Sequence, residues 1–194
     1  MIDYLFVFAA YLMGSVSSAI VVSRALGLQD PRKVGSGNPG ATNVLRYNGK
    51  KAAIITLVGD ILKGAIPVLA ARAYGVEPMI LGWVMLAAFL GHVFPVFHGF
   101  RGGKGVATAF GALTALNGWV GLALIVIWLL TVLAFRYSSL AGLVAALAAP
   151  LLVGWFQVGT FFIYITLVMT VLLVWRHRSN VRNLLAGTED KIGH

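Results

Sequence analysis

Seven long apolar runs occupy most of this chain and limit its fold more than any other feature. They cover residues 3 to 23, 52 to 74, 79 to 97, 105 to 118, 119 to 135, 140 to 156 and 160 to 176. A helix that crosses a membrane needs about 20 mostly apolar residues, and the runs approach or reach this length. We therefore expect an all-α integral membrane protein, folded as a compact bundle of about seven transmembrane helices.

The composition excludes a soluble domain. Hydrophobic residues make up 59% of the 194 residues and charged residues only 11%, whereas soluble domains carry roughly 25% charged residues. Little chain lies outside the runs, so we expect residues 1–194 to form a single transmembrane domain with its chemistry on short loops. The net charge of +9 does not indicate nucleic-acid binding, because that inference needs a basic face on a soluble surface.

The distribution of Lys and Arg predicts the orientation, because cytoplasmic loops of membrane proteins carry an excess of both. If the chain starts outside and crosses seven times, thirteen of its fifteen cations share one side. These thirteen are Arg24, Arg32, Lys33, Arg46, Lys50, Lys51, Arg101, Lys104, Arg136, Arg176, Arg178, Arg182 and Lys191. We therefore expect the N-terminus outside and the C-terminus in the cytoplasm. The short run at 105 to 118 is the weakest candidate span. If it does not cross the membrane, the orientation of every later span is reversed.

The connection at about 27–51 is too long for a plain turn, since helix connections in bundles usually run about 2 to 8 residues. Its centre, residues 35–46, reads GSGNPGATNVLR. Successive backbone N–H groups in such a glycine-rich turn can bind an anion. Thr42 or Asn43 could cap a short helix there, with Arg46 one turn further on. A tight surface loop is the alternative, and glycine content alone favours it.

A second glycine-rich segment, residues 91–105, reads GHVFPVFHGFRGGKG. It lies where the third run ends and the fourth begins, and its loop covers about 98–105. Glycines beside Lys104 would let the backbone approach an anion at the start of a helix, while Lys104 supplies a point charge. The segment is not a nucleotide P-loop, because the Walker pattern needs Gly where His98 stands and Ser or Thr where Gly105 stands. His92 and His98 can equally be packed or interfacial histidines.

Two opposite charges lie inside the second run. Asp60 and Lys63 are one helical turn apart, and each costs about 2.5 to 3.5 kcal/mol to insert at the centre of a membrane helix. Their spacing lets them pair with each other. Mutual neutralisation is therefore the simplest explanation; a functional pair would orient loop residues or line a polar route.

Polar groups also follow the fifth and seventh runs. Residues 136–139 read RYSS, and the C-terminal flank at about 176–190 begins RHRSNVRN. Arginines after a span are ordinarily topology signals. His177, Asn180 and Asn183 add a polar helical face that this rule does not require, and Ser139 adds a hydroxyl group on the same predicted side.

The polar segments carry cations and hydroxyl groups but few acids, so they favour anions. Hard metals would need carboxylates, and neither spaced zinc-binding histidines nor the nucleophile elbow of a serine hydrolase occurs. We expect no metal and no cofactor. Two classes remain: an enzyme acting on phosphorylated, lipid-soluble substrates, or a membrane transporter of a phosphorylated anion. The internal repeats common in transporters are not visible.

Three segments also carry a resemblance: GSGNPGATNVLR, GHVFPVFHGFRGGKG and HRSNVRNLLAGTE. Together they resemble the three cytoplasmic signatures of the bacterial acyl-phosphate:glycerol-3-phosphate acyltransferases, the PlsY type. GDILKG at 59–64 is similar to a further feature of that family. One departure is Asn183, where the family pattern has a basic residue. The resemblance implies transfer of an acyl group from acyl phosphate to glycerol 3-phosphate, giving 1-acyl-glycerol 3-phosphate (lysophosphatidic acid) and phosphate.

The resemblance also suggests roles for individual residues at the cytoplasmic side of a bacterial inner membrane. One phosphate would be held by Ser36, Gly37, Asn38, Thr42 and Asn43. Lys104, with Arg46 and Arg101, would neutralise the leaving phosphate beside Gly102 and Gly103. His177 and Asn180 would bind glycerol 3-phosphate, with Ser139 as a weaker candidate. Acyl phosphate has a good leaving group, so we expect direct attack without a covalent acyl-enzyme, with His177 or an acyl phosphate oxygen as the base.

Overall fold

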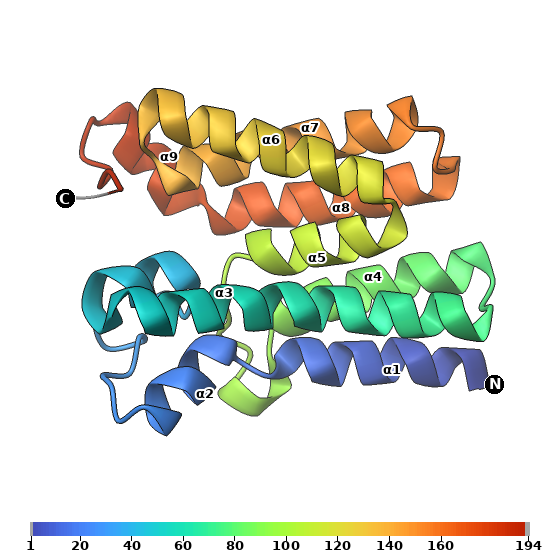
Figure 1. Ribbon diagram of the computed structural model, residues 1–194, viewed down its shortest axis with the longest axis horizontal. Helices are drawn as coiled ribbons and strands as arrows, with labels where there is room; N and C mark the ends of the chain where they lie inside the picture. Colours follow the sequence, from blue (N-terminus) through green and yellow to red (C-terminus); the bar gives the residue numbers. More distant parts are fainter. Residues whose placement is uncertain (1, 193–194) are drawn as a thin grey trace. The chain divides into compact units, whose positions relative to one another are not determined.

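The computed structural model describes residues 2–192, and every regular element within that range is a helix (Figure 1). This confirms the predicted all-α class. The chain divides into two compact units, Met1–Leu116 and Asn117–His194.

The first unit is built from two pairs of helices in close contact. Its elements are α1 (Ile2–Ser15), α2 (Ser18–Ala25), α3 (Ala41–Tyr74), α4 (Pro78–Val93), the short 3₁₀ helix η1 (Val96–His98) and α5 (Val106–Leu116). α1 packs against α4, and α3 packs against α5 (Figure 1). Glycines permit both approaches: a Cβ atom at Gly14 would lie 2.2 Å from the Ala88 carbonyl oxygen, and one at Gly111 would lie 2.1 Å from that of Ile61. Small residues at such crossings are typical of membrane helix packing.

The predicted first span, residues 3 to 23, is not one continuous helix. It breaks between α1 and α2, and the two helices are bent by 47°. Ser17 is extended, with φ −83° and ψ 103°. The apolar sequence gives no sign of this break. The break leaves the Val16 carbonyl outside a regular helix, and its hydrogen-bond donor is Lys63 of α3.

The predicted long connection at 27–51 is shorter than expected, because helix α3 already begins at Ala41. Gly49 interrupts α3 with φ 85° and ψ 172°, a conformation essentially limited to glycine. The turns before it form the short helix expected near Arg46. Its N-cap is Gly40, which makes no side-chain capping bond. The expectation that Thr42 or Asn43 caps it is therefore wrong, since both lie inside the helix.

Within its described residues, up to 192, the second unit has three long helices and one short helix. Its elements are α6 (Gly118–Phe135), α7 (Ser138–Trp155), α8 (Thr160–Arg176) and α9 (Arg178–Leu185). α7 packs against both α6 and α8, and the Thr170 hydroxyl donates to the Ala146 carbonyl across the α7–α8 contact at 2.9 Å. Asn117 caps α6 by accepting from the backbone N–H of Trp119 at 2.9 Å, which agrees with the boundary predicted between the runs at 105 to 118 and 119 to 135. α9 bends away from α8 by 58°.

By length and apolar composition, four helices among the described residues can cross a membrane, and up to six spans result if each bent pair counts as one. The protein is therefore an all-helical, multi-pass chain. The predicted span at 105 to 118 corresponds to α5, an apolar helix of only 11 residues. Whether it makes the seventh span depends on the residues that precede it.

Candidate functional site

The loop between α2 and α3 is organised around the amide of Asn43. Its Oδ1 accepts from the backbone N–H of Ser36 at 3.2 Å, and its Nδ2 donates to the carbonyls of Pro31 at 2.8 Å and Val34 at 3.1 Å. The side chain is only 3% exposed. Asn43 therefore shapes the loop from inside, whereas the predicted role was direct contact with phosphate.

Because Asn43 lies inside the loop, other residues of the loop form its outer surface. Ser36 and Gly37 are exposed and Asn38 is half-buried. Gly37 has φ 68°, and the backbone N–H of Asn38 lies 3.4 Å from the Ser36 Oγ. The backbone N–H groups of Ser36, Gly37 and Asn38 donate within the loop, to the Asn43 Oδ1, the Val34 carbonyl and the Ser36 Oγ. The groups that this loop offers an anion are therefore the Ser36 hydroxyl and the Asn38 amide.

One acid lies at the start of this loop, and it is neutralised locally. Asp30 forms an ion pair with Arg32 at 2.6 Å. The Arg32 guanidinium, which donates to the carboxylate, lowers the pKa of Asp30 to about 2. The pair is therefore charged on both sides throughout the physiological range, and Asp30 neutralises Arg32.

Asn48 fixes the other end of the loop. Its Nδ2 donates to the Ser23 Oγ of α2 and to the Gln29 carbonyl, each at 2.9 Å. This contact lies one residue before the break at Gly49. The short helical turn that carries Thr42 and Arg46 is thus held at both ends, and Arg46 itself is exposed.

The second glycine-rich segment is anchored to the end of α4. The backbone N–H of Gly102 donates to the Val93 carbonyl at 3.2 Å, and that of Gly103 donates to the His92 carbonyl at 3.1 Å. A Cβ atom at Gly103 would lie 2.1 Å from the His92 Nε2. These glycines are therefore required for close packing, and their N–H groups serve the fold, so the phosphate contact predicted for them does not follow from this geometry. Lys104 comes next and is half-buried.

Further contacts hold this segment beside the break in the first span. The Tyr11 hydroxyl donates to the Phe94 carbonyl at 2.8 Å, and the backbone N–H of Val96 donates to the Ser15 Oγ at 3.3 Å. Arg24 and Arg32 are close enough to His98 to act on its charge. Within the first unit, the two glycine-rich segments thus belong to one cationic end. Arg101 is exposed on it.

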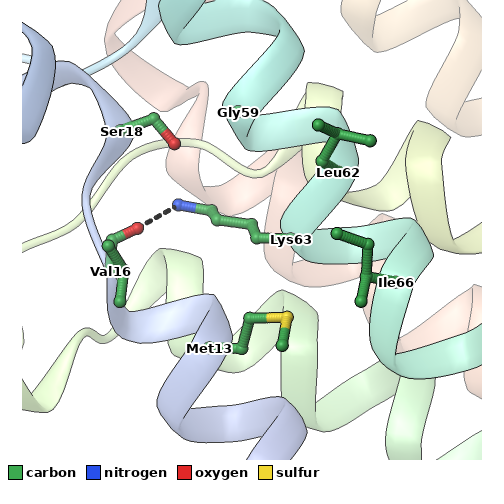
Figure 2. A pocket seen from close by; sticks show the side chains of 7 residues that line it. All are labelled: Met13, Val16, Ser18, Gly59, Leu62, Lys63 and Ile66. Atoms are coloured by element: carbon green, nitrogen blue, oxygen red, sulfur yellow. Dashed lines mark hydrogen bonds between the residues drawn. The ribbon is translucent and has the colours of Figure 1, made fainter. Parts of the chain in front are cut away.

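Asp60 and Lys63 pair as predicted, at 2.8 Å in the interior of the first unit. The Lys63 Nζ also donates to the Val16 carbonyl at the α1–α2 break, at 2.8 Å. Figure 2 shows this bond beside a cavity of about 240 Å³. The cavity is lined by Met13, Val16, Ser18, Gly59, Leu62, Lys63 and Ile66.

In the second unit, Glu189 joins two residues that the sequence singles out. Its Oε1 accepts from the Ser139 hydroxyl at 2.5 Å and from the Asn180 Nδ2 at 2.7 Å. Ser139 lies in the first turn of α7, where the helix dipole favours negative charge. The C-terminal segment returns to this end of α7, because the backbone N–H of Ile192 donates to the Arg136 carbonyl at 2.7 Å.

His177 lies between α8 and α9 and is 3% exposed. Its Nδ1 is 2.8 Å from the Leu173 carbonyl oxygen. A carbonyl only accepts, so Nδ1 carries the proton. In the neutral ring the basic nitrogen is therefore Nε2. Asn180 follows one helical turn later, in α9.

Glu189 is the residue that the sequence reasoning missed as part of this site. The signal was a carboxylate ending the segment HRSNVRNLLAGTE, in a region otherwise rich in cations. An acid placed among basic and amide side chains indicates a specific partner. Its contact with Ser139 spans 50 residues, which no local pattern predicts.

Several known proteins are similar to this chain over nearly its whole length. A family model described as glycerol-3-phosphate acyltransferase matches residues 4–187. A glycerol-3-phosphate acyltransferase of Ralstonia nicotianae is 58% identical, covering 97% of this chain and 93% of that protein. One from Thioalkalivibrio sulfidiphilus is 54% identical, with the same two coverages.

Two solved structures are similar in fold as well. A crystal structure of PlsY (YgiH), an integral membrane glycerol 3-phosphate acyltransferase in its glycerol 3-phosphate form, matches with a TM-score of 0.94 and 40% identity. The lysophosphatidic acid form of PlsY (YgiH) matches with a TM-score of 0.92 and 39% identity. Both matches cover 100% of this chain and 96% of the solved chain.

Proposed function

Because this chain belongs to the PlsY-type glycerol-3-phosphate acyltransferase family, we propose that it transfers an acyl group from acyl phosphate to glycerol 3-phosphate in the membrane. The enzyme is a glycerol-3-phosphate acyltransferase that produces lysophosphatidic acid, an intermediate of phospholipid synthesis. The observation that carries the proposal is the full-length likeness to one fold solved with the acceptor substrate and again with the acylated product.

The cationic end of the first unit is assigned to the acyl donor. Acyl phosphate is a mixed anhydride, so its reaction needs orientation and stabilisation of negative charge more than an enzyme nucleophile. Ser36, Gly37 and Asn38 offer exposed or half-exposed polar groups, and Thr42 lies in the turn that follows. In this proposal they hold one phosphate, and Asn43 supports them through the loop contacts already described.

The leaving phosphate is assigned to Lys104, with Arg46 and Arg101 adding charge. Lys104 follows two glycines that are fixed to α4 by backbone bonds, so its main chain has a defined position. A preorganised cation is worth more to a transition state than a mobile one, because no reorganisation is needed during the reaction.

The second unit is assigned to glycerol 3-phosphate, through His177, Asn180 and Ser139. Support comes from the contacts of Ser139 and Asn180 with Glu189. The Ser139 hydroxyl and the Asn180 amide both donate to its carboxylate oxygen, so these two donors converge on one anionic oxygen. The acceptor hydroxyl attacks the acyl carbon directly, and its proton passes to the His177 Nε2 or to an acyl phosphate oxygen. Isolation of an acylated serine from a reaction quenched during turnover would contradict direct transfer.

We also propose the finer topology: seven crossings, the N-terminus outside, and the four polar segments on the cytoplasmic side of a bacterial inner membrane. The support is the one-sided distribution of thirteen cations and the positive-inside rule. In the membrane the acyl chain of the donor is already in apolar surroundings.

The deciding assay uses the purified full chain in detergent, with glycerol 3-phosphate and three donors tested separately: acyl phosphate, acyl-CoA and acyl carrier protein thioester. We expect lysophosphatidic acid only with acyl phosphate. Turnover with a thioester would refute the donor assignment. No turnover with any donor, together with uptake of labelled glycerol 3-phosphate into liposomes, would instead favour the transporter alternative.

A further inference from the structure

A buried chain of charged and polar groups connects three parts of the first unit. Lys63 contacts the Val16 carbonyl at 2.8 Å and Asp60 at 2.8 Å, and the His92 Nδ1 lies 3.6 Å from the same Asp60 oxygen. Asp60, Lys63 and His92 are 3%, 6% and 6% exposed. We call these three residues the buried triad.

Mutual neutralisation of Asp60 and Lys63 does not account for this arrangement. A self-contained ion pair on one helix would need neither a carbonyl at the α1–α2 break nor an imidazole on α4. Lys63 instead donates to the carbonyl that the α1–α2 break leaves outside a regular helix (Figure 2), and backbone carbonyls at such ends need a partner. The carboxylate of Asp60 lies between this cation and His92.

His92 then connects the triad to the glycine segment. Its carbonyl accepts from the Gly103 N–H at 3.1 Å, and its ring packs so closely that a Cβ atom at Gly103 would lie 2.1 Å from Nε2. The ring and the backbone of one residue therefore both define where Gly103 lies. Lys104 is the next residue.

We propose that Asp60, Lys63 and His92 are positioning residues, which fix the main chain of Gly103 and so the location of the Lys104 ammonium group. The inference rests on the proposed role of Lys104 in the transfer reaction. A misplacement of a catalytic group by about 1 Å can cost about a hundredfold in rate. Loss of the triad should therefore lower kcat while the donor and acceptor still bind.

The test measures kcat, both KM values and the thermal unfolding midpoint of the purified chain with acyl phosphate and glycerol 3-phosphate. His92→Leu should lower kcat about tenfold to a hundredfold, with both KM values within threefold. The matched control is Arg72→Met. Arg72 also donates from α3 to helix-end carbonyls, those of Ala115 and Leu116, but lies far along α3 from the triad. The Arg72→Met variant should have a lower thermal unfolding midpoint, with kcat within about twofold of the unaltered chain.

The double variant Asp60→Asn with Lys63→Met separates positioning from neutralisation, because it removes both charges at once. If the pair only neutralises itself, the double variant recovers both the unfolding midpoint and kcat relative to either single variant. The proposal predicts that the midpoint recovers only in part, because the Val16 carbonyl has lost its donor, and that kcat stays about tenfold low or lower. Recovery of kcat, or an unchanged kcat in His92→Leu, would overturn the proposal.

A second comparison tests whether His92 acts through Lys104. In a Lys104→Arg background, His92→Leu should cost much less in kcat than in the unaltered chain, because the group it positions is already displaced. Fully multiplicative effects would overturn the proposal. The absence of turnover by the unaltered chain would instead refute the proposed function. Full turnover by Lys104→Ala would refute the role of Lys104. These results differ from those that would overturn the positioning role of the triad.

Discussion

At the scale of single residues, Glu189 shows how one carboxylate can organise a site of otherwise neutral and basic groups. It accepts from Ser139 and Asn180 at 2.5 and 2.7 Å. Hydrogen bonds to an ionised acceptor are roughly twice as strong as neutral ones. The carboxylate therefore holds the two side chains in a fixed relation, and both are proposed ligands of glycerol 3-phosphate.

Glu189→Ala removes this acceptor from two donors. We expect a lower thermal unfolding midpoint and a KM for glycerol 3-phosphate raised about tenfold, since a donor left without its partner costs about 1 to 3 kcal/mol. Glu189→Gln should give values of the midpoint and the KM between those of Glu189→Ala and the unaltered chain, because the Gln amide oxygen still accepts hydrogen bonds. Asp190→Ala, at the neighbouring acid, is the control. Equal effects of the Glu189 and Asp190 variants would mean that general charge, and not this contact, matters.

Lys104→Ala tests the cation assigned to the leaving phosphate. We expect kcat to fall at least about a hundredfold, the usual effect of removing one preorganised group that stabilises transition-state charge. The unfolding midpoint should change little, because Lys104 is half-buried at a segment held by backbone bonds. Lys51→Ala, an exposed lysine in α3, should keep full activity. Retained activity in Lys104→Ala would remove this residue from the site.

His177→Ala distinguishes binding from base catalysis. We expect kcat/KM for glycerol 3-phosphate to fall about tenfold to a hundredfold, as for loss of a hydrogen bond to a charged group. A fall in kcat would identify the Nε2 as the base, whereas a raised KM with steady kcat would assign the base to the acyl phosphate. His177→Asn is the companion variant, because its amide can still donate toward Leu173. An unchanged kcat/KM in both would exclude His177 from the site.

At the scale of elements, the sequence predicted helix positions well and helix breaks poorly. The ends of α6, α7 and α8 lie within a few residues of the predicted runs, because the ends of an apolar run are visible in the local sequence. The break at Val16 was hidden, since its carbonyl is satisfied by Lys63, 47 residues away. The same limit applies to the site: glycines and cations were visible, but the contact from Glu189 to Ser139 depends on tertiary structure.

Gly49 offers a direct test of the break in α3. It has φ 85° and ψ 172°, and a Cβ atom there would meet nothing within 4 Å. Any cost of Gly49→Ala is therefore backbone strain, about 1 to 3 kcal/mol, seen as a lower unfolding midpoint. Gly118→Ala is the matched control, since its Cβ also meets nothing and no positive φ is present. If both variants unfold at the same temperature, the strained conformation at Gly49 is absent in solution.

At the scale of the whole molecule, the open question is whether α5 crosses the membrane. An 11-residue helix spans only about 16 Å, roughly half of the hydrocarbon core. Irregular backbone at membrane depth is tolerated only where it is buried in protein and its polar groups are satisfied. Gly102, Gly103 and Gly105 are buried, and the first two donate to the carbonyls of Val93 and His92. The segment before α5 meets this condition and can complete the crossing.

Charge distribution favours the same conclusion. If α5 did not cross, Arg136, Arg176, Arg178, Arg182 and Lys191 would lie on the opposite side from the other eight cations. The sequence contains no cysteine, so single cysteines report topology without a background. We expect Glu77→Cys and Thr160→Cys to react with an impermeant maleimide added outside intact cells, and Lys51→Cys and Ser179→Cys only after permeabilisation. Labelling of Ser179→Cys in intact cells, with Thr160→Cys protected, would mean that α5 re-enters and that the second unit has the opposite orientation, because each crossing reverses everything after it.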